Sequence, residues 1–161
     1  MTLSIRKMQQ SDIPQVQHIA KTAWHTTYEG IIPLHIQNNF LDTAYNEARL
    51  LQRLESSIMY VAQYEGSVCG FANYSKVNDE GLCELAAIYL LPSVQGKGIG
   101  SALLQQAIQD FNGLKEIHVN VEQANTIGMN FYLAKGFKIV KQFEEDFEGH
   151  ILHTVRMVLE V

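Results

Sequence analysis

The stretch Gln95-Gly96-Lys97-Gly98-Ile99-Gly100 stands between an apolar run at residues 85–91 and an amphipathic run at residues 99–111. This order predicts a strand, a glycine-rich turn and a helix. The first N–H groups of a helix have no intrahelical partner and carry partial positive charge, and glycines let an anion approach them because no Cβ intervenes. The stretch therefore predicts a site for a phosphate or pyrophosphate, with a purely structural turn as the alternative.

Two common phosphate-binding motifs do not match this turn. A Walker loop requires a glycine, four further residues and then Gly-Lys-Ser/Thr, whereas Gly96-Lys97 is followed by Gly98, and Leu91 stands five residues before Gly96. The dinucleotide fingerprint requires a glycine or alanine three residues after its second glycine, and Ser101 or Leu103 stands there. A nucleotide-binding domain of either class is therefore disfavoured.

The spacing Gln95-x-x-Gly98-x-Gly100 resembles the acetyl-CoA-binding motif, Gln/Arg-x-x-Gly-x-Gly/Ala, of the GNAT N-acetyltransferase superfamily. A second block supports this resemblance, because Asn125 is followed by Phe131-Tyr132 and then by Gly136-Phe137, similar to the Asn…Phe-Tyr…Gly-Phe motif of the family. Gly128 departs from the pattern, since the family usually carries alanine there, and we expect a slightly looser helix.

The resemblance is sharpest from residue 84 to residue 137 and implies one domain over residues 1–161 with the GNAT fold. That fold is of the α/β (α+β) class: a mixed, mostly antiparallel seven-stranded sheet flanked by helices, in which the fourth and fifth strands splay around the pantetheine arm. Patterning of the residues predicts strands at 3–8, 59–64, 68–75, 82–91, 116–121, 137–143 and 151–159. It predicts helices after a Ser11 cap, at 35–40, at 43–54 behind an Asp42 cap, at 99–111 and at 126–135.

The bulk composition excludes several classes of protein. A net charge of −5 without a basic cluster argues against nucleic-acid binding. No apolar run is long enough to span a membrane, and residues 1–7 lack the apolar core of a signal peptide. The two cysteines, Cys69 and Cys83, lie in strand-like runs and are expected to be reduced core thiols of a cytoplasmic protein.

The resemblance implies acetyl-CoA as the co-substrate and assigns the residues that bind it. Backbone N–H groups of the glycine loop would hold the pyrophosphate, and the loop comprises Gln95, Gly96, Lys97, Gly98, Ile99, Gly100 and Ser101. A bulge in the preceding strand would free backbone groups of Ile88, Tyr89 and Leu90 beside the pantetheine and the developing oxyanion. Asn125 would cap the next helix or bind the pantetheine amides, and both roles stay open.

Transfer of an acetyl group to an amine requires a neutral amine and a proton for the leaving thiolate. Tyr132 matches the family tyrosine that points at the CoA sulfur, and its phenol, with an ordinary pKa near 10, is protonated at neutral pH. Packing beside Phe131 is the alternative role. Glu84 lies eleven residues before Gln95, a spacing at which one branch of the family carries its general base. Strand alternation would place Glu84, Ala86 and Ile88 on one face. An exposed carboxylate without a role, with ordered water as the base, is the alternative.

The acceptor site is expected where the first helices and the last hairpin meet, which suggests Trp24, Tyr28 and also Tyr74. The acidic run at residues 144–148 would attract a polyamine or another cationic amine, or it is simply a solvated turn. His150 and His153 would face opposite ways in a strand, so we expect no metal.

We therefore expect an acetyl-CoA-dependent N-acetyltransferase that acts on a primary amine of a small molecule or peptide by direct attack in a ternary complex. A non-catalytic acyl-CoA-binding or sensor domain of the same fold is the alternative. A homodimer is compatible with either interpretation, and neither requires a nucleic acid or a membrane as partner.

Overall fold

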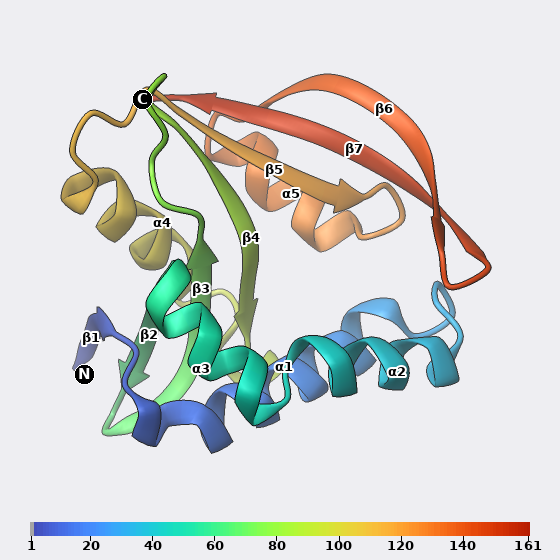
Figure 1. Ribbon diagram of the computed structural model, residues 1–161, viewed down its shortest axis with the longest axis horizontal. Coiled ribbons are helices and arrows are strands. Elements are labelled where there is room, and N and C mark those ends of the chain that lie inside the picture. The colour runs from blue at the N-terminus through green and yellow to red at the C-terminus, as the bar shows by residue number, and fades with distance from the viewer. Residues whose placement is uncertain (1) are drawn as a thin grey trace.

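The computed structural model describes residues 2–161, which form a seven-stranded sheet with helices on both faces (Figure 1). The sheet has the strand order β1-β2-β3-β4-β5-β7-β6. In chain order the elements are β1 (Leu3–Lys7), the 3₁₀ turn η1 (Gln10–Asp12), α1 (Ile13–Tyr28), α2 (Leu34–Ala44), α3 (Glu47–Ser56), β2 (Ile58–Tyr64), β3 (Ser67–Tyr74), β4 (Leu82–Leu90), the 3₁₀ turn η2 (Pro92–Val94), α4 (Ile99–Asp110), β5 (Glu116–Glu122), α5 (Thr126–Ala134), β6 (Lys138–Phe147) and β7 (His150–Glu160).

All neighbouring strands are antiparallel except β4 and β5, which are parallel. The parallel pairing is short, because it joins only Leu82–Glu84 to Glu116–His118. Beyond these residues β4 and β5 diverge, as Figure 1 shows. The predicted mixed, mostly antiparallel sheet is therefore confirmed, and its one parallel junction is the place where it opens.

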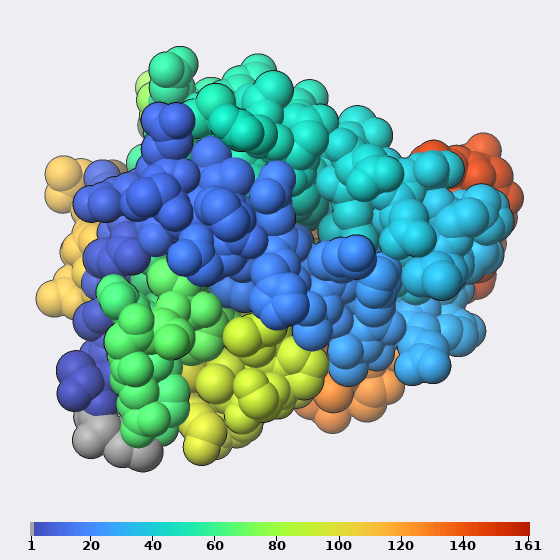
Figure 2. Space-filling model, turned by 90° about the horizontal axis from the view of Figure 1, so that it is seen from below, coloured from blue at the N-terminus to red at the C-terminus, as the bar shows by residue number. Residues whose placement is uncertain are grey.

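Two hydrophobic clusters hold the helices on the sheet. One cluster lies under α1, α2 and α3 and includes Val16, Ile19 and Leu50, which are fully buried. The other lies under α4 and α5 and includes Leu103 and Tyr132. Figure 2 shows the face covered by α1, α2 and α3, with the tip of the β6–β7 hairpin emerging beside α2.

Two predicted helix caps are wrong. Ser11 lies inside η1, and α1 follows Asp12 without a side-chain cap. The boundary behind Asp42 is also wrong, because α2 continues to Ala44 and α3 begins after Asn46, whose side chain accepts a hydrogen bond from Arg49 N at 2.9 Å. Ser, Asp and Asn are all favoured at helix N-caps, so residue type alone does not decide which of several nearby polar residues begins the helix.

The last hairpin is longer than predicted. β6 continues to Phe147 and β7 begins at His150, so the turn is formed by Glu148 and Gly149, which have φ angles of 51° and 86°. Most of the acidic run at residues 144–148 is therefore strand and not a solvated turn. Acidic residues are depleted in strands, but Glu144, Glu145 and Asp146 pair with His153, Leu152 and Ile151 of β7 and extend the strand here.

Both cysteines are free, buried thiols in the cluster beneath α4, and burial raises the pKa of the Cys83 thiol to about 11. Within residues 2–161, no helix is long and apolar enough to cross a membrane. The same residues contain no group of three or more His, Cys, Asp or Glu side chains arranged to hold a metal ion.

Candidate active site

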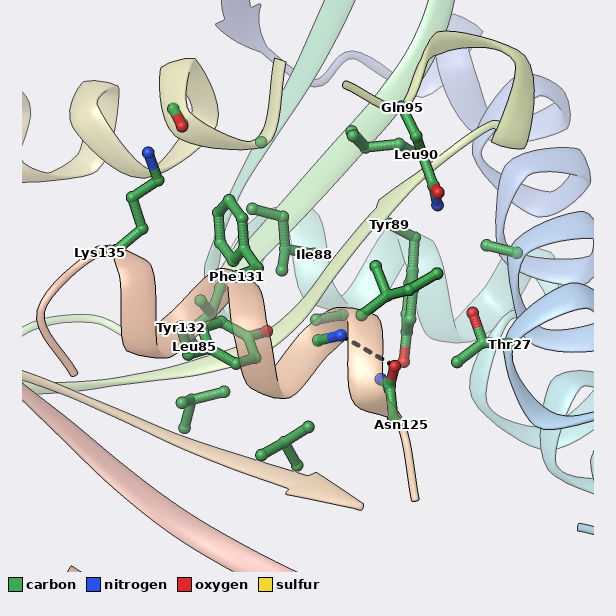
Figure 3. A pocket seen from close by; sticks show the side chains of 18 of the residues that line it. Thr27, Leu85, Ile88, Tyr89, Leu90, Gln95, Asn125, Phe131, Tyr132 and Lys135 are labelled. Atoms are coloured by element: carbon green, nitrogen blue, oxygen red, sulfur yellow. Dashed lines mark hydrogen bonds between the residues drawn. The ribbon is translucent and has the colours of Figure 1, made fainter. Parts of the chain in front are cut away.

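A cavity of about 650 Å³ lies where β4 and β5 diverge. Its walls come from α1, from the second half of β4, from the glycine loop, from the middle of β5 and from α5 (Figure 3). From Leu85 onward the edge of β4 that faces β5 has no strand beside it, so its backbone groups are available to a ligand. The cavity therefore passes between the two halves of the sheet.

The glycine loop forms one end of the cavity. Gly96 and Gly98 have φ angles of 81° and 78°, a left-handed backbone conformation that residues with a Cβ rarely adopt. Gly98 is the N-cap of α4, so the first N–H groups of that helix have no intrahelical partners, and the residues that carry them line the cavity. Of the predicted loop residues, all except Lys97 line the cavity, and the Lys97 ammonium lies over the Tyr64 ring at 5.9 Å.

Gly100 serves a different purpose from the turn glycines. A Cβ at this position would lie 3.1 Å from the Phe131 ring, which is tighter than ordinary van der Waals contact. The glycine therefore lets α4 and α5 approach each other at the cavity wall. Lys135 lines the cavity near the same place, and its ammonium lies 5.8 Å from the centre of the Phe131 ring. A ligand phosphate at the helix start would have a cation close by.

The start of α5 holds Asn125 against the helix. The Asn125 side chain accepts a hydrogen bond from Gly128 N at 3.0 Å and caps α5, and the residue also lines the cavity. A Cβ on Gly128 would lie 2.6 Å from Asn125 Nδ2. The sequence suggested that Gly128 merely loosens the helix, whereas the structure shows that it provides the space for the Asn125 amide.

Tyr132 lies on the cavity side of α5 and is 8% exposed (Figure 3). Its ring packs edge-on against Phe131 and Phe137, each with ring centres 5.3 Å apart. Burial raises the pKa of the Tyr132 phenol above its ordinary value, and the neighbouring Tyr28 adds to the rise. Both proposed roles, packing and proton donation, are therefore physically compatible with this position.

A bulge at Ala86 changes the phase of β4. Tyr74 pairs with Leu85, while Asn73 pairs with Ala87, so Ala86 is the extra residue. Ile88 consequently packs on the same cluster as Leu85, whereas Ala87 belongs to the cluster beneath α1. The expected alternation of Glu84, Ala86 and Ile88 on one face is therefore wrong. Ile88, Tyr89 and Leu90 do line the cavity, just after the bulge.

Glu84 lies before the bulge and outside the cavity wall. Its carboxylate accepts a close hydrogen bond from the Arg156 guanidinium of β7. Arg156 also donates to Asn120 Oδ1 at 3.0 Å and contacts His118 Nδ1 at 3.1 Å, which places this cluster on the face of β5 opposite α5. The carboxylate predicted as general base is thus engaged by a guanidinium.

The three aromatic residues suggested for the acceptor site have different positions. Tyr28 lines the cavity at the end of α1, as do Ala23 and Thr27. Trp24 lies behind this wall, stacked on Phe40 with ring centres 4.4 Å apart. Tyr74 is fully buried beneath α4, where its hydroxyl donates to Leu103 O at 3.2 Å.

The polar groups beside the cavity at α1 concentrate around Tyr28. Burial raises the pKa of Tyr28 to about 12, and the negative charge of Glu122 contributes to the rise. The Tyr89 and Asn125 side chains lie close enough to the Tyr28 hydroxyl to lower that pKa in part. Figure 3 shows the Tyr89 ring reaching towards Asn125. Burial also raises the pKa of Tyr89, so these phenols are neutral at physiological pH.

Sequence reasoning missed many residues of the cavity wall, among them Ala23, Thr27, Asn120, Phe131 and Lys135. Some of these carried a signal. Ala23 and Thr27 are four residues apart on the helix that also carries Tyr28, which places them on one face. Asn120 is a polar residue in an alternating strand, but only the divergence of β4 and β5 brings it to a cavity.

Comparison with known proteins agrees with this geometry. A spermidine N(1)-acetyltransferase of Thermoplasma acidophilum is 27% identical over 155 residues, covering 91% of this chain and 95% of that protein. The peptidyl-lysine N-acetyltransferase YiaC of Escherichia coli is 29% identical over 144 residues, covering 84% of each chain. The crystal structure of PaiA N-acetyltransferase from Thermoplasma acidophilum in complex with coenzyme A has a TM-score of 0.88 at 25% identity, over 100% of both chains.

The acetyltransferase (GNAT) family model matches residues 16–137, a region that contains the glycine loop, the cavity between β4 and β5, and α5. The matched segment is most of the chain, and the protein therefore belongs to the GNAT acetyltransferase family.

Proposed function

We propose that this protein transfers the acetyl group of acetyl-CoA to a primary amine by direct attack in a ternary complex. The observation that carries the proposal is the single cavity that joins the glycine loop of α4 to the wall formed by α1. A cofactor held at the loop and an amine entering beside α1 would meet inside one cavity. Bringing two reactants together in this way supplies much of the rate enhancement of a bimolecular reaction.

The residues of the wall suit the separate demands of acetyl transfer. Backbone N–H groups of Gln95 to Ser101 would bind the pyrophosphate. The free edge of β4 at Ile88, Tyr89 and Leu90 would bind the pantetheine and stabilise the oxyanion. Tyr132, kept neutral by burial, would give its proton to the leaving thiolate. No covalent enzyme intermediate is needed, because the amine attacks the thioester itself.

The route by which the amine loses its proton follows from the position of Glu84. Because Glu84 pairs with Arg156 and lies outside the cavity wall, the geometry favours loss of the proton to water over transfer to this carboxylate. The base assignment made from the sequence stays a prediction. Comparison of the pH–rate profiles of wild type and Glu84→Gln tests it.

We propose a di- or polyamine as the acceptor. One relative is a spermidine N(1)-acetyltransferase that aligns along nearly its full length. This chain also carries a net charge of −5, and the β6–β7 hairpin that carries Glu145 contacts α1 through Phe147 and Trp24. Cationic amines are attracted to such a surface. Trp24 would support the acceptor wall from behind, and Tyr28 would contact the acceptor.

The experiment is an acceptor panel with acetyl-CoA, in which release of the CoA thiol is followed for spermidine, 1,4-diaminobutane, 1-aminobutane and a lysine peptide. We expect turnover with the first two. Turnover with the peptide alone would refute the acceptor class and retain the enzyme. Saturable acetyl-CoA binding without turnover on any amine would instead favour the sensor interpretation. Cytoplasmic location, absence of nucleic-acid binding and a homodimer stay predictions.

A further inference from the structure

Glu122, at the end of β5, is a buried carboxylate that the proposed chemistry does not use. It is 9% exposed. Its Oε2 accepts a hydrogen bond from His153 N at 2.8 Å, and its Oε1 accepts a long one from Ala124 N at 3.4 Å. In the part of the chain that the structure describes, no Lys, Arg or His side chain forms an ion pair with it. Buried charges in proteins are normally paired with an opposite charge.

The position of Glu122 connects it with the acceptor side of the cavity. Alternation along β5 places Asn120 and Glu122 on the same face, and Asn120 lines the cavity. Two residues along a strand span about 7 Å, a distance that a short diamine can bridge. Tyr28 also lines the cavity, and the charge of Glu122 contributes to its raised pKa. The carboxylate therefore lies just beyond the wall formed by α1.

A second carboxylate lies on the outer side of Glu122. Thr154 of β7 is directly opposite Glu122 and is 4% exposed. Its hydroxyl donates to Glu145 Oε1 of β6 at 2.5 Å. Thr154 is therefore the cross-strand neighbour of Glu122 and also bonds the exposed carboxylate of β6 on the same face of the sheet. The adjacent Glu144 points to the opposite face, because successive residues of a strand alternate.

We propose that Glu122 binds the non-reacting ammonium group of a di- or polyamine acceptor, with Glu145 as the outer carboxylate of the same subsite. The proposal rests on the proposed function and names how its acceptor is selected. With one amine in the cavity near Asn120, the second ammonium would supply the positive charge that Glu122 lacks. A monoamine of the same length would leave Glu122 without that partner.

The bonds from Ala124 and His153 give Glu122 a structural role as well, because they hold the β5–α5 connection and β7. A comparison of two acceptors separates the roles. The test measures kcat/KM for 1,4-diaminobutane and 1-aminobutane with wild type, Glu122→Gln, Glu145→Gln and Glu144→Gln. It also measures binding of the diamine to the CoA-loaded protein by calorimetry. Glu144→Gln is the matched control, since it removes the same charge from the opposite face of β6.

We expect Glu122→Gln to lower kcat/KM for the diamine about tenfold or more, equivalent to roughly 1.4 kcal/mol, with the monoamine changed less than about twofold. Glu145→Gln should lower the diamine value by a few fold, and Glu144→Gln should leave both unchanged. Equal losses for the two amines would assign Glu122 to structure only. An unchanged diamine value, or no diamine binding to wild type, would overturn the proposal.

Two further outcomes are decisive. If Glu122→Gln does not fold, a comparison of Glu145→Gln with Glu144→Gln decides the question. Both positions are exposed, and only Glu145 faces the subsite. A diamine-selective loss confined to Glu145→Gln supports the subsite, and equal behaviour of the two variants overturns it. If no amine is acetylated but the CoA-loaded protein binds the diamine through Glu122, the proposed function fails and the subsite stands.

Discussion

The substitution Gly128→Ala, at the start of α5, is expected to lower activity although alanine favours the helix. The backbone at Gly128 is not in the left-handed region, so its φ angle also allows alanine. Alanine is the better helix former by up to about 1 kcal/mol. Its Cβ, however, would lie 2.6 Å from Nδ2 and 3.0 Å from Cγ of Asn125. The Asn125 amide must therefore move, which breaks the 3.0 Å cap to the Gly128 N–H.

The two effects on stability oppose each other. Loss of an N-cap costs about 1 kcal/mol, which offsets most of the gain in helix propensity. We therefore expect the free energy of unfolding to change by less than about 1 kcal/mol. Activity should respond more strongly, because Asn125 lines the cavity and lies close to Tyr28. Loss of one hydrogen bond of about 1 kcal/mol to the ligand corresponds to a fall of roughly fivefold in kcat/KM for acetyl-CoA.

A double-mutant cycle with Asn125→Ala is the assay. In the Asn125→Ala background the new methyl group meets no amide, so Gly128→Ala should be stabilising and should leave kcat/KM unchanged. Chemical denaturation and steady-state kinetics on the four proteins give the coupling between the two residues. Additive effects on both stability and kcat/KM would refute the argument that Gly128 provides space for the Asn125 amide.

Four further predictions address the site and the fold. Gly98→Glu should abolish acetyl-CoA binding, because it places bulk and negative charge at the start of α4; normal affinity by calorimetry would contradict the loop assignment. Tyr132→Phe should retain CoA affinity and lower kcat by up to roughly 10²–10⁴-fold; an unchanged kcat with chemistry rate-limiting would leave the phenol only a packing role. Glu84→Gln should give a pH–rate profile parallel to that of wild type, because Glu84 pairs with Arg156; a rate lost at neutral pH and restored at high pH would instead identify it as the base. The bidentate bond from Arg6, at 2.7 and 2.9 Å, lowers the pKa of Asp12 below its ordinary value. That stabilisation is present above the ordinary pKa of about 3.9 and is lost as the pH falls through the lower folded-state pKa, so Asp12→Asn should flatten the acid side of the stability curve measured by thermal unfolding.

The features that sequence reasoning could find are those with local chemistry. The turn at Gly96 and Gly98 needs glycine because of its backbone conformation, so it is visible as residue identity. The helix that carries Tyr132 is predicted by a capping residue at its start, by the helical spacing of its apolar residues and by a glycine just after its end. These signals are contained within short segments and do not depend on distant partners.

The features that it missed depend on pairing between strands. The bulge at Ala86 arises from the register between β3 and β4, and it moves Ile88 to the face opposite the expected one. The Arg156 that engages Glu84 is 72 residues away in the chain. No pattern within β4 contains either fact. Likewise, the charge of residues 144–147 suggested a turn because their pairing with β7 cannot be derived from that segment alone.

The short junction of β4 and β5 has a mechanical consequence. The sheet consists of two antiparallel halves, β1 to β4 and β5 with β7 and β6, that share only the pairing of Leu82–Glu84 with Glu116–His118. A ligand that bonded to both sides of the gap would add cross-links where the sheet has few. Amide hydrogen exchange should therefore slow together in β4 and β5 when the ligand binds, while the outer strands β1 and β6 change little. A bound cofactor would then take the place of a strand between β4 and β5. The two halves of the sheet would move as one rigid body only in the complex.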